Sequence, residues 1–90
     1  MKPIRRHRDF AKHFHKRITN NPKLVKQFED RLTLFMTSHR GYPLNDHALT
    51  GALVGRRSFS ITADIRVIYV ETADAIIFLD IGTHAQVYRK

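Results

Sequence analysis

Three side chains of this sequence have the chemistry for proton transfer and charge stabilisation on a phosphate: His47, His84 and Arg66. A free imidazole changes charge near pH 6.5 and can donate or accept a proton in a reaction at neutral pH. A guanidinium stays charged, and its planar fork matches two oxygen atoms of a phosphate. Simpler interpretations exist, because loop histidines are common and Arg66 could form a weak surface ion pair with Asp80. The residue types therefore permit phosphate chemistry without establishing it.

Four further residues near these three are candidates for binding or catalysis. Asp64 lies in a predicted turn, where an aspartate is also common for conformational reasons. Arg56 and Arg57 could contact phosphate or be solvated, and Tyr88 could hold the C-terminal end of the chain in place. None of these residues indicates a function without its neighbours.

A metal site is not predicted. The chain has no cysteine, and His13 and His15 are two positions apart, so they would leave a helix in different directions. A phosphate-binding glycine loop and a recognisable Ser/His/Asp arrangement are also missing from the sequence. We expect no cofactor.

The composition narrows the class of protein. The chain has 90 residues, with 16 Lys and Arg against 8 Asp and Glu, a net charge of +8. This length predicts one domain over residues 1–90, and without cysteine that domain must fold by packing alone. No apolar run is long enough to span a membrane and the N-terminus is too charged for a signal peptide, which predicts a cytoplasmic protein with no membrane partner. The charge favours polyanionic partners.

Residues 1–40 carry the positive excess, with 11 basic and 3 acidic residues, and show a helical pattern. Apolar residues recur every four positions from 10 to 18, and a second amphipathic stripe runs from 24 to 36. Asn21 is a suitable N-cap and Pro22 fits the first helical position. We predict two helices, the second ending near His39, followed by a long loop over residues 44–55.

From Arg57 onward the apolar period becomes two, which predicts three antiparallel strands. A five-residue turn over 71–75 would pair Val70 with Ile76 and Arg66 with Asp80. Phe78 would then lie beside Arg66 on the face of the sheet turned away from the helices.

The two predicted faces differ in polarity. Ile65, Val67 and Leu79 would share an apolar face that receives the helices, while Ser58 and Ser60 would accompany Arg66 on the other face. An arginine on a sheet face among apolar residues usually has a partner, so this face is the predicted site.

Four sequence stretches, in this order, resemble the RelE/ParE superfamily of bacterial toxins, and within it the YafQ-like branch. They contain the patterns DHxLxG, RVIY and GTHxxVY, and they lie at residues 46–51, 55–61, 64–69 and 82–88. The resemblance is close over residues 46–88, whereas the helical half agrees in arrangement more than in sequence.

The resemblance implies an α+β fold of the RelE type, with two N-terminal helices packed on a small antiparallel sheet. It also implies the toxin of a type II toxin–antitoxin system, a metal-independent ribonuclease that cuts messenger RNA in the ribosomal A site and so inhibits translation. In that reaction the ribose 2′-OH attacks the adjacent phosphate. The implied partners are the ribosome, the message and a cognate antitoxin, a small DNA-binding protein through which operator DNA would be contacted.

The resemblance also implies roles for individual residues. The positions of His47, Asp64, His84 and Tyr88 match active-site positions, and Arg66 matches a phosphate-contacting arginine. The two histidines would act as acid and base, with Asp64 orienting an imidazole and Tyr88 stacking on or bonding to the nucleotide. Further candidates for RNA contact are Arg56, Arg57, Lys12, Lys16, Arg17, Lys23 and Lys26.

One departure and two alternatives remain open. YafQ-like toxins place an aspartate and a histidine on the strand after the glycine loop, where this chain has Ser58 and Ser60. A ParE-like poison of DNA gyrase, or an inactive relative that binds only antitoxin and DNA, would share the fold. The combination of His47, Arg66 and His84 argues against the gyrase poison.

Overall fold

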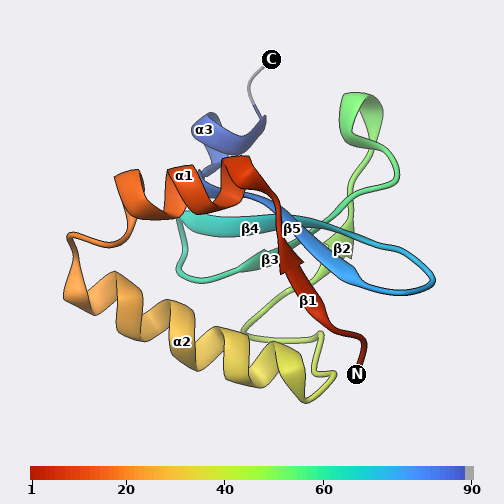
Figure 1. Ribbon diagram of the computed structural model, residues 1–90, viewed down its shortest axis with the longest axis horizontal. Coiled ribbons are helices and arrows are strands. Elements are labelled where there is room, and N and C mark those ends of the chain that lie inside the picture. Colours follow the sequence, from red (N-terminus) through yellow and green to blue (C-terminus); the bar gives the residue numbers. More distant parts are fainter. Residues whose placement is uncertain (89–90) are drawn as a thin grey trace.

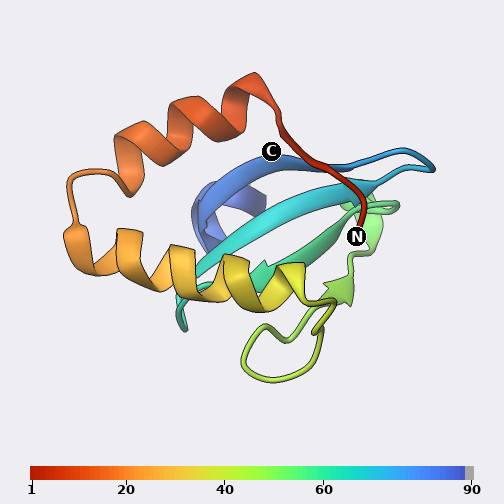
Figure 2. The ribbon, with the colours of Figure 1, turned by 60° about the horizontal axis from the view of Figure 1, so that its bottom comes forward.

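Five strands form one mixed sheet in the order β1-β5-β4-β3-β2, with α1 and α2 on one side of it and α3 on the other (Figures 1 and 2). The computed structural model describes residues 1–88. The elements are β1 (Ile4–Arg6), α1 (Arg8–Arg17), α2 (Pro22–Met36), β2 (His47–Ala48), the 3₁₀ turn η1 (Gly51–Leu53), β3 (Arg57–Ser60), β4 (Ile65–Glu71), β5 (Ile76–Thr83) and α3 (His84–Tyr88). The predicted α+β fold is confirmed. The structure adds a third helix and a parallel edge strand.

The predicted helix boundary at residue 21 is confirmed by its capping geometry. The side-chain oxygen of Asn21 accepts a hydrogen bond of 3.2 Å from the Leu24 N–H, and Pro22 begins α2. The helix ends at Met36, before the predicted position near His39, because Ser38 adopts a left-handed backbone with φ of 67°.

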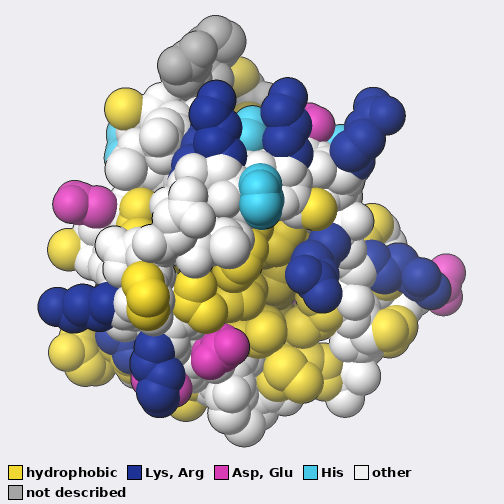
Figure 3. Space-filling model, turned by 60° about the vertical axis from the view of Figure 1, so that its left-hand side comes forward, with side chains coloured by type: hydrophobic (Ala, Val, Ile, Leu, Met, Phe, Trp, Pro, Cys, Tyr) yellow, Lys and Arg dark blue, Asp and Glu magenta, His cyan; other side chains and the backbone are white. Residues whose placement is uncertain are grey.

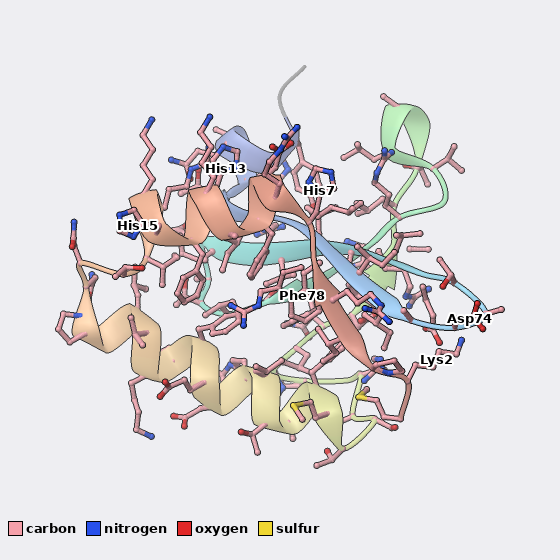
Figure 4. The ribbon with its side chains drawn as sticks, in the orientation of Figure 1. Lys2, His7, His13, His15, Asp74 and Phe78 are labelled. Carbon is pink, nitrogen blue, oxygen red and sulfur yellow. The ribbon has the colours of Figure 1, made fainter. Side chains whose placement is uncertain are left out.

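Aromatic side chains fill the space between the two long helices and the sheet. Phe78 lies at the centre of this layer (Figure 4), with its ring centroid 5.4 Å from that of Phe10 and 5.9 Å from that of Phe35. Phe35 stacks on Phe59 with centroids 4.5 Å apart. Because these four residues are almost completely buried, this aromatic cluster anchors α1 and α2 to the sheet.

The predicted register between β4 and β5 is wrong for two reasons. The turn is one residue shorter than expected, because Thr72 closes a tight loop and Glu71 pairs with Ile76. A bulge then shifts the register again, so that Ile68 pairs with Asp80.

The shorter turn changes the face that β5 residues occupy between the turn and the bulge. Phe78 pairs with Tyr69 and faces the helices, whereas Leu79 borders a pocket with Ile68 on the opposite side. Arg66 lies opposite Gly82 and Ser60, not opposite Asp80. Because the register is shifted by one residue, the β5 side chains between the turn and the bulge occupy the face opposite to the predicted one. Beyond the bulge, the second shift returns the β5 side chains to their predicted face.

Two short strands were not predicted. β1 runs parallel to β5, and the Pro3 carbonyl accepts a 2.9 Å hydrogen bond from the Ile76 N–H. β2 lies inside the predicted loop and pairs His47 with Ser58 of β3. In the part of the chain that the structure describes, no helix is both long enough and apolar enough to cross a membrane.

Candidate active site

An open pocket of about 380 Å³ lies on the side of the sheet that carries α3. Its lining comes from β2, β4, α3 and the segment around η1, and comprises His47, Leu49, Thr50, Ala52, Leu53, Arg66, His84 and Tyr88. The structure thus brings together four of the five residues expected to be catalytic.

The pairing of three strands puts two of these side chains on one sheet face. His47 lies opposite Ser58, which lies opposite Ile68, and two positions along the strands Ser60 lies opposite Arg66. Directly opposed residues point to the same face, and so do residues two apart in a strand. The strand pairing therefore puts His47 and Arg66 on the same face of the sheet, where both line the pocket.

Arg66 has little protein bonding of its own. Within residues 1–88 its Nε is buried without a hydrogen-bond partner, and its Nη2 donates a long hydrogen bond of 3.4 Å to the Ala63 carbonyl. The guanidinium carbon lies 5.8 Å from the centroid of the Tyr88 ring. Among residues 1–88 no carboxylate forms an ion pair with it. Its charge is therefore available to a ligand.

The predicted partner of Arg66, Asp80, is occupied elsewhere. Its carboxylate lies 2.6 Å from Nδ1 of His13 and 3.5 Å from Nη1 of Arg17, both on α1. The predicted cross-strand ion pair is wrong because the shorter turn and the bulge together place Gly82, and not Asp80, opposite Arg66.

A reciprocal capping arrangement orients the two pocket residues of α3. The Thr83 hydroxyl accepts from the Gln86 N–H at 3.2 Å, and the Gln86 side-chain oxygen accepts from the Thr83 N–H at 2.8 Å. His84 and Tyr88 follow at a spacing of four, so their rings lie on one side of the helix, with centroids 4.4 Å apart. The spacing of Thr83 and Gln86 in the sequence is the signal that would have predicted this helix.

His47 is held in one orientation by the backbone. Its Nδ1 lies 2.9 Å from the Asn45 carbonyl oxygen. Since a carbonyl only accepts hydrogen bonds, Nδ1 carries the hydrogen and the lone pair of a neutral ring is on Nε2.

Asp46, a residue for which no role was predicted, anchors the backbone next to His47. Its carboxylate is completely buried, with Oδ1 2.7 Å from Nε of Arg57. The Tyr69 hydroxyl donates to Oδ2, and Nε of Arg40 lies 3.8 Å from the same oxygen. Burial and the hydrogen bond to Asp46 raise the pKa of Tyr69 to about 12.

Arg57, one of the residues expected to contact RNA, forms an ion pair with Asp46. The hydrogen bond to that carboxylate raises the pKa of the guanidinium. Arg57 pairs with Tyr69 and therefore lies on the helix side of the sheet. Its structural role explains its presence.

The other expected site residues lie outside this pocket. Asp64 is exposed in the turn between β3 and β4, where its N–H donates to the Thr62 hydroxyl. Arg56 borders a neighbouring hollow with Leu53 and Val87.

Of the basic residues expected to contact ribosomal RNA, some are exposed to solvent and others form ion pairs or hydrogen bonds within the protein. Lys12, Lys16 and Lys23 are exposed. Lys26 forms a 2.8 Å ion pair with Asp30, which raises the pKa of the lysine. Arg17 donates to the Ile81 carbonyl at 2.8 Å. In Figure 3, Lys, Arg and His side chains gather at the height of α1 above a hydrophobic area.

Histidines 13 and 15 separate as expected. His13 contacts Asp80, and His15 is exposed at another position on α1 (Figure 4). Residues 1–88 contain no group of three His, Asp or Glu side chains arranged to hold a metal ion.

Comparison with known proteins identifies relatives. Residues 2–89 match the family described as bacterial toxin of type II toxin-antitoxin system, YafQ. No curated protein matches the chain.

Solved structures share the fold. A copper-bound mutant toxin from Helicobacter pylori has 24% identity and a TM-score of 0.82, over 98% of this chain and 100% of that one. YafQ from E. coli strain BL21(DE3) has 22% identity and a TM-score of 0.76, over 99% and 100%. The E. coli DinJ-YafQ complex gives 23% and 0.74, over 99% and 100%.

Proposed function

We propose that this chain, which belongs to the YafQ family of toxins from bacterial type II toxin–antitoxin systems, is an endoribonuclease that cleaves messenger RNA in the ribosomal A site. The observation that carries the proposal is the pocket in which an unpaired guanidinium, two imidazoles and an aromatic ring converge. Cleavage of a phosphodiester by its own 2′-OH needs a base, an acid and a cation, and this pocket contains side chains of all three kinds.

We assign the base to His47. With Nδ1 donating to the Asn45 carbonyl, Nε2 is free to take the proton of the ribose 2′-OH. The 2′-oxygen then forms a bond to phosphorus, and the charge that develops on the phosphorane oxygens is stabilised by Arg66.

His84 is the proposed acid. It gives a proton to the 5′-oxygen as the bond between that oxygen and phosphorus breaks, which leaves a 2′,3′-cyclic phosphate and a 5′-OH. Tyr88, whose ring lies beside His84 and Arg66, is proposed to stack on a base of the substrate. Asp64, being outside the pocket lining, is proposed to act only if RNA contacts the turn itself.

A cognate antitoxin is the proposed protein partner. The E. coli relative is known in complex with DinJ, a toxin–antitoxin pair, and an acidic antitoxin would complement the charge of +8 of this chain. Contact with operator DNA would occur through the antitoxin. The exposed lysines of α1 and α2 are proposed to dock on ribosomal RNA.

The test is to add the purified protein to ribosomes translating a defined message and to map the new RNA ends by primer extension. We expect cuts within the codon in the A site, and products that carry a 5′-OH. A message that stays intact under these conditions would refute the proposed activity.

A further inference from the structure

A second cavity, of about 470 Å³, adjoins the active-site pocket and shares Arg66 with it. We refer to it as the Arg31 cavity. It lies between α2, the loop that follows α2 and the turn between β3 and β4, and its lining comprises Arg31, Tyr42, Pro43, Asn45, Ser60, Ile61, Thr62, Ala63 and Arg66. Its volume is in the range of small-molecule sites.

Two guanidinium nitrogens in this lining are buried and have no partner. They are Nε of Arg31 and Nε of Arg66, which lack an acceptor within residues 1–88, and both arginines line the cavity. A buried N–H without an acceptor is costly, and a charged group has a larger penalty than a neutral one. Two such donors on one cavity indicate a site for an anion that supplies the missing acceptors.

The rest of the cavity lining also favours a negatively charged ligand. No acidic side chain is part of it. The Thr62 hydroxyl oxygen accepts hydrogen bonds from two backbone N–H groups, at 3.1 and 2.9 Å, so its own hydrogen remains available to a ligand.

An exposed aromatic ring stands at the rim. Tyr42 is 84% exposed, yet its loop is firmly held. The Tyr42 carbonyl lies 2.7 Å from the His39 ring nitrogen Nε2, and the neighbouring Leu44 is fully buried and accepts a 2.7 Å hydrogen bond from the Ser60 N–H. A solvent-exposed ring on an anchored loop offers a preorganised surface for stacking.

We propose that the Arg31 cavity binds the nucleotide of the message next to the scissile phosphate, with its phosphodiester on Arg31 and Arg66 and its base on Tyr42. This inference rests on the proposed function, because the shared Arg66 makes the two cavities successive subsites along one RNA strand. It assigns binding roles to Arg31 and Tyr42, which the sequence pattern did not single out.

The test is an NMR titration of the whole chain with an RNA trinucleotide whose riboses are 2′-O-methylated, so that no cleavage occurs. Arginine Nε–H signals and the Tyr42 ring signals are followed in the wild type, in Arg31→Ala, in Tyr42→Ala and in Arg8→Ala. Arg8 is an exposed arginine at the start of α1 and serves as the matched control. A parallel titration uses inorganic phosphate.

We expect the Nε–H signals of Arg31 and Arg66 to move together with those of Tyr42. Arg31→Ala should raise the dissociation constant of the trinucleotide by about 10-fold or more, the loss expected for a hydrogen bond to a charged group, and Arg8→Ala should leave it unchanged. Arg31→Lys should recover less than half of the binding free energy that Arg31→Ala loses, because a lysine lacks the planar fork of a guanidinium.

Three results would overturn the inference. The first is no trinucleotide binding by the wild type. The second is movement of the Arg66 signal without those of Arg31 and Tyr42, which would leave the proposed nuclease intact. The third is that inorganic phosphate saturates the same signals equally well and that Tyr42→Ala leaves the dissociation constant of the trinucleotide unchanged. This result would mean that the cavity binds an anion but no nucleobase. If the trinucleotide binds as expected and the ribosome assay shows no cleavage, the proposed function fails and the RNA site stands.

Discussion

Nε and Nη2 of Arg57 both lie 2.7 Å from one oxygen of Asp46, a carboxylate that is completely buried. This pair connects β3 to the residue that precedes His47, and the Tyr69 hydroxyl completes the contact from β4. The candidate base of the active site is therefore held in place from the opposite, helix-covered side of the sheet.

Asp46→Asn should destabilise the fold by roughly 2–4 kcal/mol, because it leaves a guanidinium and a buried hydroxyl with a neutral, poorly matched partner. Urea unfolding would measure the change. Asp74→Asn, at an exposed loop position, is the control and should alter the free energy of unfolding by less than about 0.5 kcal/mol. Equal effects of the two substitutions would contradict the structural role of Asp46.

Tyr69 predicts a loss of stability at high pH. Its pKa is about 12 in the folded chain, mainly because burial disfavours the phenolate, and about 10 in an unfolded chain. A raised folded-state pKa gives stability that is complete below pH 10 and is lost as the pH rises toward 12. Subtracting the unfolding free energies of Tyr69→Phe from those of the wild type across pH 8–12 should isolate this decline. A difference that does not vary with pH would show that the phenol does not titrate in this way.

Arg66→Ala should leave the fold intact and remove most of the activity. Its one direct protein hydrogen bond in the described residues is 3.4 Å long, so the folded state loses little. Removal of a donor that stabilises transition-state charge lowers rates by a factor on the order of 10² or more. Single-turnover cleavage of ribosome-bound message measures the rate, and circular dichroism checks the fold. Cleavage at the parental rate would eliminate Arg66 from the mechanism.

The two histidines predict a bell-shaped dependence of the cleavage rate on pH, because a base must start unprotonated and an acid protonated. Replacing His47 with Gln should remove the acidic limb, and replacing His84 with Gln should remove the basic limb. Rate profiles of both variants on ribosome-bound message would show this. Unchanged profiles would refute the acid–base assignment without refuting cleavage, since Arg66 and ribosomal groups could then carry the reaction.

Ribosome binding should weaken steeply with salt, because each phosphate neutralised by a lysine releases condensed counterions. Lys12→Glu with Lys16→Glu should lower the slope of binding against salt, since both side chains are exposed on α1. Pelleting assays with ribosomes at several salt concentrations measure that slope. Binding that is insensitive to salt would mean that these lysines serve only the antitoxin.

The sequence was sufficient for features that depend on neighbours in the chain. Asn21 and Pro22 set the start of α2 through local capping. Alternation of apolar residues located β3 and β4, and a nearly continuous apolar run located β5. Placement of Arg66 on the face with Ser58 and Ser60 followed from the same alternation and is confirmed by the strand pairing. The motifs around His47 and His84 indicated the family for the same reason, since they are short and contiguous.

Tertiary structure alone decided the features that join distant residues. The four-residue turn that puts Phe78 opposite Tyr69, and the bulge that puts Gly82 opposite Arg66, are features of how β4 and β5 pair across the sheet. Asp46 contacts Arg57 and Tyr69 only once the strands have paired, and Arg31 and Arg66 line one cavity only once α2 has packed on the sheet. Periodicity specifies which face a side chain occupies, but the partner across that face is set by register and packing, because both are fixed by contacts between residues far apart in the chain.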